Sequence, residues 1–160
     1  MTLCDKGYNE ALERALLLLK YRKRSESELT RRLRKLGFSE GVAKEVSGRL
    51  KEDGLIDDED FAFSFMEELL RKGYGKLRIT KELYRKGLSK ETVEIVMASY
   101  PHEDEEDRAL EQAVRKYERF KGDASIKRKL YSFLIRKGYS SEIARQTISR
   151  CLVDTEETQE

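Results

Sequence analysis

Side chains that could carry out catalysis are few in this sequence. The only histidine, His102, follows Pro101 in an acidic stretch and has no serine or cysteine in a recognisable nucleophile motif beside it. The segment 73–75 (Gly-Tyr-Gly) lacks the third glycine of a dinucleotide-binding loop and has no predicted strand before it. We therefore expect no catalytic residue and no cofactor, and we predict that the chain is not an enzyme.

Residues 57–60 form a run of carboxylates that could suggest a metal site. A calcium loop needs ligands at alternate positions, a glycine and a distal glutamate, and this run does not have that spacing. Because the run directly precedes Phe61 and its apolar stripe, we expect it to cap a helix and to interact favourably with the helix dipole. Cys4 and Cys151 are the only cysteines and lie near opposite ends of the chain, so we expect reduced thiols, no metal site and a cytoplasmic protein.

Basic side chains offer binding chemistry instead. The chain has 33 Lys and Arg against 31 Asp and Glu, so its net charge is only +2. The charges are nevertheless clustered: residues 20–37, 71–90 and 115–137 are basic, whereas residues 52–68 and 91–111 are acidic. Clusters of Lys and Arg suit salt bridges to an acidic protein surface or to DNA phosphates. The candidate partner-binding or DNA-binding residues are Arg22, Lys23, Arg24, Arg31, Arg32, Arg34, Arg71, Lys72, Lys76, Arg78, Lys81, Arg85, Lys127, Arg128 and Lys129.

The basic clusters recur with an internal repeat of the sequence. In each copy, two apolar residues four positions apart are followed by a glycine and then by a serine. The three copies are Leu29, Leu33, Gly37 and Ser39; Ile79, Leu83, Gly87 and Ser89; and Leu130, Leu134, Gly138 and Ser140. Because the apolar positions stay in phase with the glycines, we predict three related structural units.

Each unit predicts three helices. Apolar residues spaced three and four apart, such as Leu12, Ala15 and Leu19, indicate an amphipathic first helix. The repeated glycine ends the second helix in a left-handed conformation, and the serine after it caps the third. Ser25 and Glu28 have the spacing of a capping box at the start of a second helix. The sequence therefore predicts an all-α fold of three tandem three-helix repeats in an elongated, or curved, array.

The expected domain boundaries follow from the repeat. The first repeat, with an N-terminal lead, covers residues 1–54, the second covers residues 55–101 and ends at a proline, and the third covers residues 102–152. Residues 153–160 are polar and acidic, and we expect them to form a flexible tail. The longest apolar run, Ala15–Leu19, is too short to span a membrane, and we find no signal-peptide pattern, so we expect no membrane association.

Residues 28–46 also resemble a DNA-reading helix-turn-helix unit, in which a glycine turn joins two helices. The third helices argue against this reading, because the one at residues 89–100 carries Glu91 and Glu94 against Lys90 alone, and phosphates would repel such a helix. Two other functions stay open from the residues alone. One is direct binding of nucleic acid by the basic clusters, and the other is a helical-repeat adaptor for another protein.

Residues 54–62, GLIDDEDFA, lead to a more specific hypothesis. They are followed by Gly73, Gly75, Arg78 and Ile79, and then by the segments Glu82-Leu83 and Lys86-Gly87-Leu88. Together these motifs resemble the signature of the RecX family, regulatory proteins of the RecA recombinase. The resemblance covers about residues 10–152 and departs most in the third repeat, where residues 121–123 are inserted before the second helix.

The resemblance implies an all-helical protein of tandem three-helix repeats that acts in homologous recombination, DNA repair and the SOS response. Similar proteins lodge in the helical groove of the active RecA filament on single-stranded DNA. They limit filament growth and thereby restrain ATP hydrolysis, strand exchange and co-protease activity. For this chain we therefore expect the RecA filament as the partner, single-stranded DNA reached through that filament, and a monomer. No catalytic residue is carried over from the family.

Overall fold

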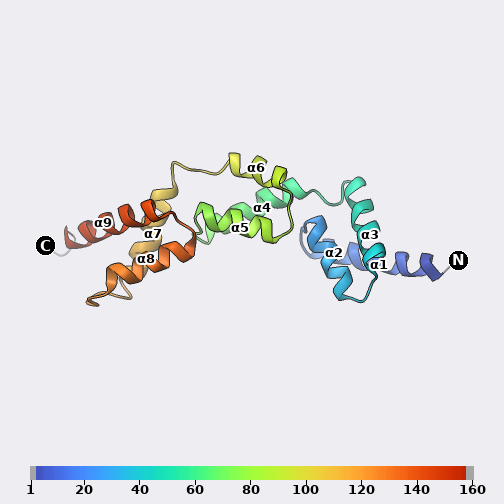
Figure 1. Ribbon diagram of the computed structural model, residues 1–160, viewed down its shortest axis with the longest axis horizontal. Coiled ribbons are helices and arrows are strands. Elements are labelled where there is room, and N and C mark those ends of the chain that lie inside the picture. The colour runs from blue at the N-terminus through green and yellow to red at the C-terminus, as the bar shows by residue number, and fades with distance from the viewer. Residues whose placement is uncertain (1–2, 158–160) are drawn as a thin grey trace. The chain divides into compact units, whose positions relative to one another are not determined.

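The computed structural model describes the backbone of residues 3–157 and the side chains of residues 7–153. Within that part of the chain it contains nine α-helices and no strand (Figure 1), which confirms the predicted all-α fold of three-helix repeats. The helices are α1 (Leu3–Tyr21), α2 (Glu26–Lys35), α3 (Glu40–Glu52), α4 (Asp58–Arg71), α5 (Lys76–Arg85), α6 (Lys90–Ala98), α7 (Glu105–Tyr117), α8 (Ile126–Lys137) and α9 (Ser141–Glu157).

The predicted serine caps are present at the starts of four helices. The backbone N–H of Glu28 donates to Ser25 Oγ at 3.1 Å, so one of the unpaired N–H groups in the first turn of α2 has an acceptor. Ser39, Ser89 and Ser140 cap α3, α6 and α9 in the same way. The return half of the capping box is replaced, because the Glu28 carboxylate accepts from arginines of the α1–α2 connection.

The acidic run before α4 is a helix cap, as predicted. Asp57 Oδ1 accepts the backbone N–H of Glu59 at 2.9 Å and that of Asp60 at 3.0 Å. The carboxylates that follow Asp57 lie in the first turn of α4, where the helix dipole favours negative charge. Among the residues that the structure describes, no three metal-ligating side chains come together.

The glycines that end the second helices adopt the left-handed conformation. The angle φ is +98° at Gly37, +79° at Gly87 and +92° at Gly138. An L-residue with a side chain is strained at such angles, which explains why glycine stands at this position in all three repeats.

The chain packs as two units, one of residues 1–65 and 83–96 and the other of residues 66–82 and 97–160. Helices α4 and α5 each contribute to both units. The buried core of the first unit includes Ala11, Ala15, Leu29, Leu33, Ala43, Val46 and Leu50. The buried core of the second unit includes Ala109, Ala113, Leu130, Leu134, Tyr139 and Ala144. Most of these residues belong to the predicted apolar stripes, but Ala11 and Ala109 do not. Leu12 and Leu19 of the predicted stripe on α1 are only half-buried, so the periodicity identified most of the core but not the exact buried face of the first helices.

In the first unit, the start of α2 packs against the start of α4 and the end of α5. Ser25 is fully buried, and its Oγ donates to the carbonyl of Lys86, directly after α5, at 2.8 Å. The N–H of Glu26 donates to Asp58 Oδ1, in the first turn of α4, at 2.9 Å. We call this arrangement the first joint, because it connects the first repeat to the second.

In the second unit, the start of α5 makes an equivalent arrangement with the start of α7 and the end of α8. The N–H of Gly75 donates to the carbonyl of Lys137 at 2.9 Å, and the N–H of Leu77 donates to that of Gly138 at 3.0 Å. The N–H of Lys76 donates to Oε1 of the buried Glu105, in the first turn of α7, at 3.1 Å. We call this the second joint. In both joints, the first turn of a second helix lies between a carboxylate and a carbonyl of the next repeat.

Two expectations concern the ends of the chain. Helix α9 continues to Glu157. The flexible tail at residues 153–160 stays a prediction. Residues 158–160 of the expected tail and the side chain of Cys4 lie outside the described residues, whereas Cys151 is buried on α9.

Candidate partner-binding surface

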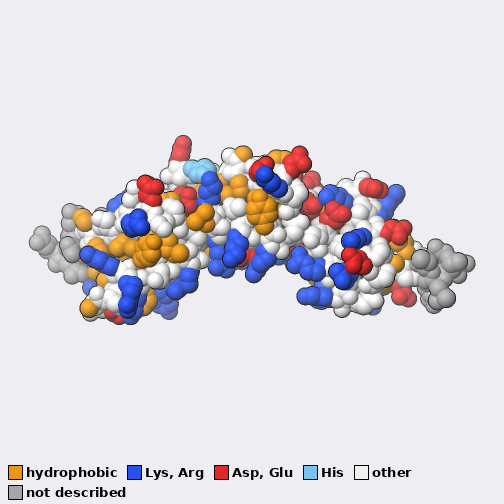
Figure 2. Space-filling view, viewed as in Figure 1, with side chains coloured by type: hydrophobic (Ala, Val, Ile, Leu, Met, Phe, Trp, Pro, Cys, Tyr) orange, Lys and Arg blue, Asp and Glu red, His pale blue; other side chains and the backbone are white. Residues whose placement is uncertain are grey.

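The predicted cations lie at the ends of the first helices and on the second helices of the three repeats. Figure 2 shows Lys and Arg side chains over α2, over α5 and over α8. Their hydrogen bonds and ion pairs divide them into two groups. Some are used within their own unit, and others have no ionic partner among the described residues.

Three cations of the α1–α2 connection are used within the first unit. Arg22 Nη1 lies 3.2 Å from Glu28 Oε2, and Arg24 Nη1 lies 3.3 Å from Glu28 Oε1. Lys23 Nζ lies 2.5 Å from Asp60 Oδ2 on α4. These side chains connect the start of α2 to its surroundings, so a partner would have to break existing ion pairs to use them.

Glu28 is the centre of this network. Besides the two arginines, Lys86 Nζ lies 3.7 Å from Glu28 Oε1. Burial opposes ionisation of Glu28, but the hydrogen bond from Arg22 and the charges of Lys86, Arg22 and Arg24 outweigh it, so the pKa of Glu28 is lowered. Glu28 is therefore ionised at neutral pH and keeps these cations in place.

The remaining cations of the first repeat are exposed on α2. Arg34 has only a distant ion pair, 3.9 Å from Glu40 Oε2. Arg31 and Arg32 have no ion pair among the side chains that the structure describes. Exposed ion pairs contribute little to stability, so this face of α2 presents positive charge that the fold hardly uses.

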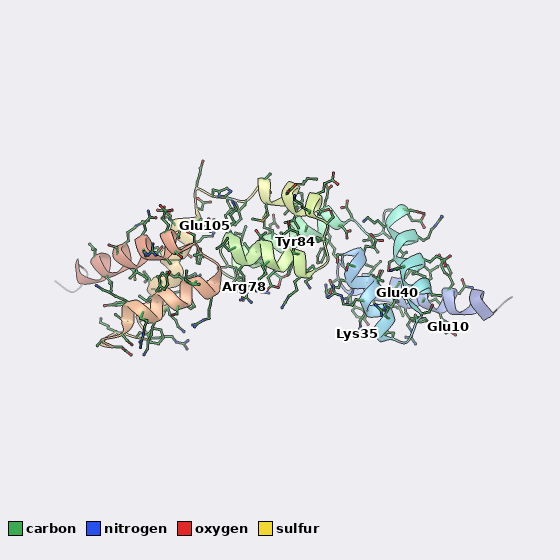
Figure 3. The ribbon with its side chains drawn as sticks, viewed as in Figure 1. Glu10, Lys35, Glu40, Arg78, Tyr84 and Glu105 are labelled. Atoms are coloured by element: carbon green, nitrogen blue, oxygen red, sulfur yellow. The ribbon has the colours of Figure 1, made fainter. Side chains whose placement is uncertain are left out.

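Arg78 is part of the second joint (Figure 3). Its Nη1 donates to the carbonyl of Arg136 at 3.3 Å, and its Nε lies 3.3 Å from Glu82 Oε1. Its guanidinium carbon lies 5.0 Å from the centre of the Tyr74 ring. The ammonium group of Lys137 lies 4.7 Å from the same ring, and burial, with the nearby charge of Arg78, lowers the pKa of Lys137. Arg78 therefore supports the fold.

The other cations of the second cluster differ from Arg78. Lys72 forms an ion pair with Glu68 one turn earlier on α4. Arg71 and Lys81 are exposed and Lys76 is half-buried, and the structure shows no ion pair for any of the three within its described side chains. Arg85, the last residue of α5, is exposed and belongs to the first unit.

The third cluster lies at the start of α8. Lys129 forms an ion pair with Asp123, and hydrogen bonds from Lys129 and Ser125 hold the pKa of Asp123 well below its usual range. Lys127 and Arg128 are exposed in a first helical turn that contains no acidic residue, and neither has an ion pair over the described side chains. Positive charge is unfavourable at a helix N-terminus, so an anion from outside would relieve it.

The predicted cations thus leave a smaller set without an ionic partner in the described part of the chain. We call Arg31, Arg32, Arg71, Lys76, Lys81, Lys127 and Arg128 the open cations. Every repeat contributes to this set. Sequence reasoning missed this division, because the acids that engage the other cations, such as Asp60, become neighbours only in the folded chain.

A second feature that sequence reasoning missed is apolar surface on α1. Leu17 and Tyr21 are one turn apart and both exposed. A signal was present: residues 16–19 are consecutive leucines, which cannot all face the same side of a helix.

The fold and the surface define the class of protein: an all-helical tandem repeat whose second helices display open cations. None of the described helices has the length and apolarity needed to cross a membrane. Family models match all three repeats: "RecX, first three-helix domain" over residues 11–50, the second over residues 57–97 and the third over residues 103–148. The chain belongs to the RecX family.

Relatives and solved structures agree with this assignment. The chain is 33% identical over 150 residues to a "Regulatory protein RecX" from Chlorobium phaeobacteroides, covering 92% of this chain and 97% of that protein. It is 37% identical over 142 residues to one from Mycolicibacterium smegmatis, covering 84% and 75%. The crystal structure of RecX from Lactobacillus salivarius has the same fold, with a TM-score of 0.77 at 22% identity over 93% of this chain and 99% of that one.

Proposed function

We propose that this chain is a cytoplasmic, non-enzymatic regulator that binds, as a monomer, in the groove of the RecA filament on single-stranded DNA. It mostly inhibits filament growth and thereby restrains ATP hydrolysis, strand exchange and co-protease activity. Membership of a family of regulatory proteins supports the regulatory role. The observation that carries the proposal further is the presence of open cations in all three repeats, where the fold does not need them.

A filament is a suitable partner for a chain of three similar units. Head-to-tail contacts between identical protomers repeat the same surface along a helical assembly. Each open cation can then meet the same kind of acidic side chain or DNA phosphate on successive protomers. Contacts that are weak one by one add up through effective concentration once the first is made. A chain that binds several protomers favours one state of the filament and opposes the changes that accompany nucleotide turnover.

The test uses three open cations of the second unit. The triple variant Arg71→Glu, Lys76→Glu, Lys81→Glu replaces attraction by repulsion at one surface. We expect it to lose inhibition of DNA-stimulated ATP hydrolysis by recombinase. The control variant Lys44→Glu, Lys90→Glu, Arg145→Glu makes the same change in net charge on the third helices, outside the proposed surface, and should inhibit like the wild type. Unchanged inhibition by a folded first variant would reject this placement of the surface.

Direct binding of nucleic acid is the second candidate, and Lys127 and Arg128 favour it, because their helix turn lacks a compensating acid. This function predicts that the chain binds DNA without recombinase and that the affinity falls steeply as salt rises. If single- and double-stranded DNA both fail to bind at low salt, direct DNA binding is rejected. The open cations would then bind acidic groups of the filament.

A further inference from the structure

The glycine that ends the second helix is covered by the preceding repeat in the second and third repeats, but not in the first. In the joints, a preceding repeat packs against the glycine that ends the second helix. A methyl group on Gly87 would overlap Ser27 of the first repeat, and one on Gly138 would overlap Arg78 of the second. At the equivalent Gly37, a methyl group would meet nothing within 4 Å among the described atoms.

The residues around Gly37 are correspondingly uncovered. Leu88 and Tyr139, which follow the other two glycines, are buried, whereas Phe38 is only half-buried. The carbonyls of Lys86 and Lys137 each accept a hydrogen bond from the preceding repeat. The carbonyl of Leu36, their equivalent, accepts none from any residue that the structure describes.

The carboxylate of the joint is also missing from the first repeat. Asp58 and Glu105 each lie four residues before a fully buried alanine of a first helix, Ala62 and Ala109. The equivalent alanine of α1 is Ala11, so the equivalent position is Gly7. Space around Gly7 is open, since a methyl group there would also meet nothing within 4 Å.

A groove lies where a preceding repeat would pack. It has a volume of about 1180 Å³ and is lined by both Gly7 and Gly37. It is also lined by Leu17, which is 50% exposed, and Tyr21, which is 84% exposed, from the second half of α1. We call this the first-repeat groove. In the first joint, the corresponding space between Asp58 and the end of α5 holds the first turn of α2.

We propose that the first-repeat groove binds the N-terminal turn of an α-helix from a protein partner. Both occupied joints hold such a turn, with a serine or a glycine at its start and hydrogen bonds to the carbonyl before the repeated glycine. An apolar side chain of the partner would cover Leu17 and Tyr21. Nucleic acid fits poorly, because the apolar surface is aliphatic in part and the carboxylates of Glu10 and Glu13 line the groove (Figure 3 labels Glu10 on α1).

The charges of the groove define the partner further. Arg14 and Arg32 also line it, and neither has an ion pair within the described side chains. The lining contains two Glu and two Arg, so Asp or Glu in the first turn of a partner helix would pair with Arg14 and Arg32 individually, and acids are favoured in that turn by the helix dipole. The first turn of α2 has this chemistry, with Ser25 followed by Glu26 and Glu28.

A second copy of this chain does not supply the partner helix. The exposed counterpart would be the start of α8, where Ile126 stands in the sequence register of Ser25 and Gly75. The preceding residue, Ser125 at the N-cap, already donates its hydroxyl to Asp123 Oδ1 at 2.6 Å. In the second joint, the Cβ atom of a side chain at Gly75 would lie 2.6 Å from the carbonyl oxygen of Gly138. A joint with this geometry therefore has no room for isoleucine at that position. Lys127 and Arg128 would also meet the positive charge of Arg14 and Arg32 in the groove.

The experiment uses the full chain and a peptide with the sequence of residues 24–35, held helical by a side-chain lactam near its C-terminus. Amide NMR signals of Gly7, Leu17, Gly37 and Phe38 should shift in a saturable way as this peptide is added. The variant Leu17→Asp, Tyr21→Asp should weaken binding by about tenfold or more. This inference is independent of the function proposed above, because no recombinase is present.

The control variant is Leu55→Asp, Ile95→Asp, which places the same charges on apolar residues of the first unit that are 57% and 42% exposed and lie outside the groove. It should bind the peptide like the wild type. Absence of saturable shifts, or equal binding by both variants, would overturn the proposal. Sedimentation velocity should show a monomer at all concentrations, and chains of copies that lengthen with concentration would overturn the choice of a different protein as partner.

Discussion

Glu28 holds three cations around one largely buried carboxylate. Arg22, Arg24 and Lys86 reach it from the α1–α2 connection and from the residue after α5. The sequence predicts Glu28 as part of a helix cap, because capping depends on residues three positions apart. The ion pairs could not be predicted, because Lys86 approaches Glu28 only through the first joint.

The pH dependence of stability tests this network. The pKa of Glu28 is lowered in the folded protein, so its contribution is fully present above the ordinary glutamate value and is lost as the pH falls through the lower folded value. The variant Glu28→Gln should therefore be less stable than the wild type at pH 7, and the two should converge in acid. Urea unfolding at a series of pH values measures this. A stability difference that stays constant down to the acid limit would contradict the assignment.

The positions of the cations could be predicted from the sequence, but their division into paired and open cations could not. Local patterns identify Lys and Arg and place them on second helices, because amphipathic spacing fixes which side of a helix faces out. They cannot separate Arg78, which is bound by Arg136 and Glu82, from Lys81 one turn later. That separation needs the contacts between helices that are far apart in the sequence.

At the scale of helices, the two joints use one design. Each places the first turn of a second helix between the start of a first helix and the end of a second helix in the next repeat. The backbone N–H groups at a helix start lack partners within the helix, and the joint supplies acceptors for them. The serine caps and the ending glycines were predictable because each acts within its own helix, whereas Glu105 as an acceptor for α5 was not.

Substitution of the repeated glycines measures what the joint contributes. Gly37 and Gly138 have similar φ values, so alanine carries the same left-handed strain at both, about 1 kcal/mol. Only at Gly138 does the added methyl group also overlap the backbone of Arg78. We expect Gly138→Ala to lower the free energy of unfolding by about 2–4 kcal/mol and Gly37→Ala by about 1 kcal/mol. Equal losses, measured by urea unfolding, would show that the contact at Gly138 is unimportant.

At the scale of the whole molecule, the arrangement of the three repeats stays a prediction. A tandem repeat in which each unit contacts only its neighbours is extended. A compact globule of 160 residues has a radius of gyration of about 15 Å. Small-angle X-ray scattering should give a clearly larger value, and a value near that of the globule would contradict the predicted elongated array.

The proposed role in regulation depends on open cations acting together from all three repeats. The variants Arg31→Glu, Lys81→Glu and Arg128→Glu each change one repeat. Each variant removes one of several similar contacts and adds repulsion. Each should therefore weaken the inhibition of filament growth by about threefold or more. The variant that combines all three substitutions should then hardly slow filament growth.

The most direct measurement is the growth rate of recombinase filaments on single-stranded DNA, followed by fluorescence on single molecules. The account predicts that the wild-type chain slows growth, that the control Lys44→Glu, Lys90→Glu, Arg145→Glu slows it equally, and that the combined variant Arg31→Glu, Lys81→Glu, Arg128→Glu leaves it at the rate without the chain. Equal slowing by the combined variant and the wild type would contradict the account.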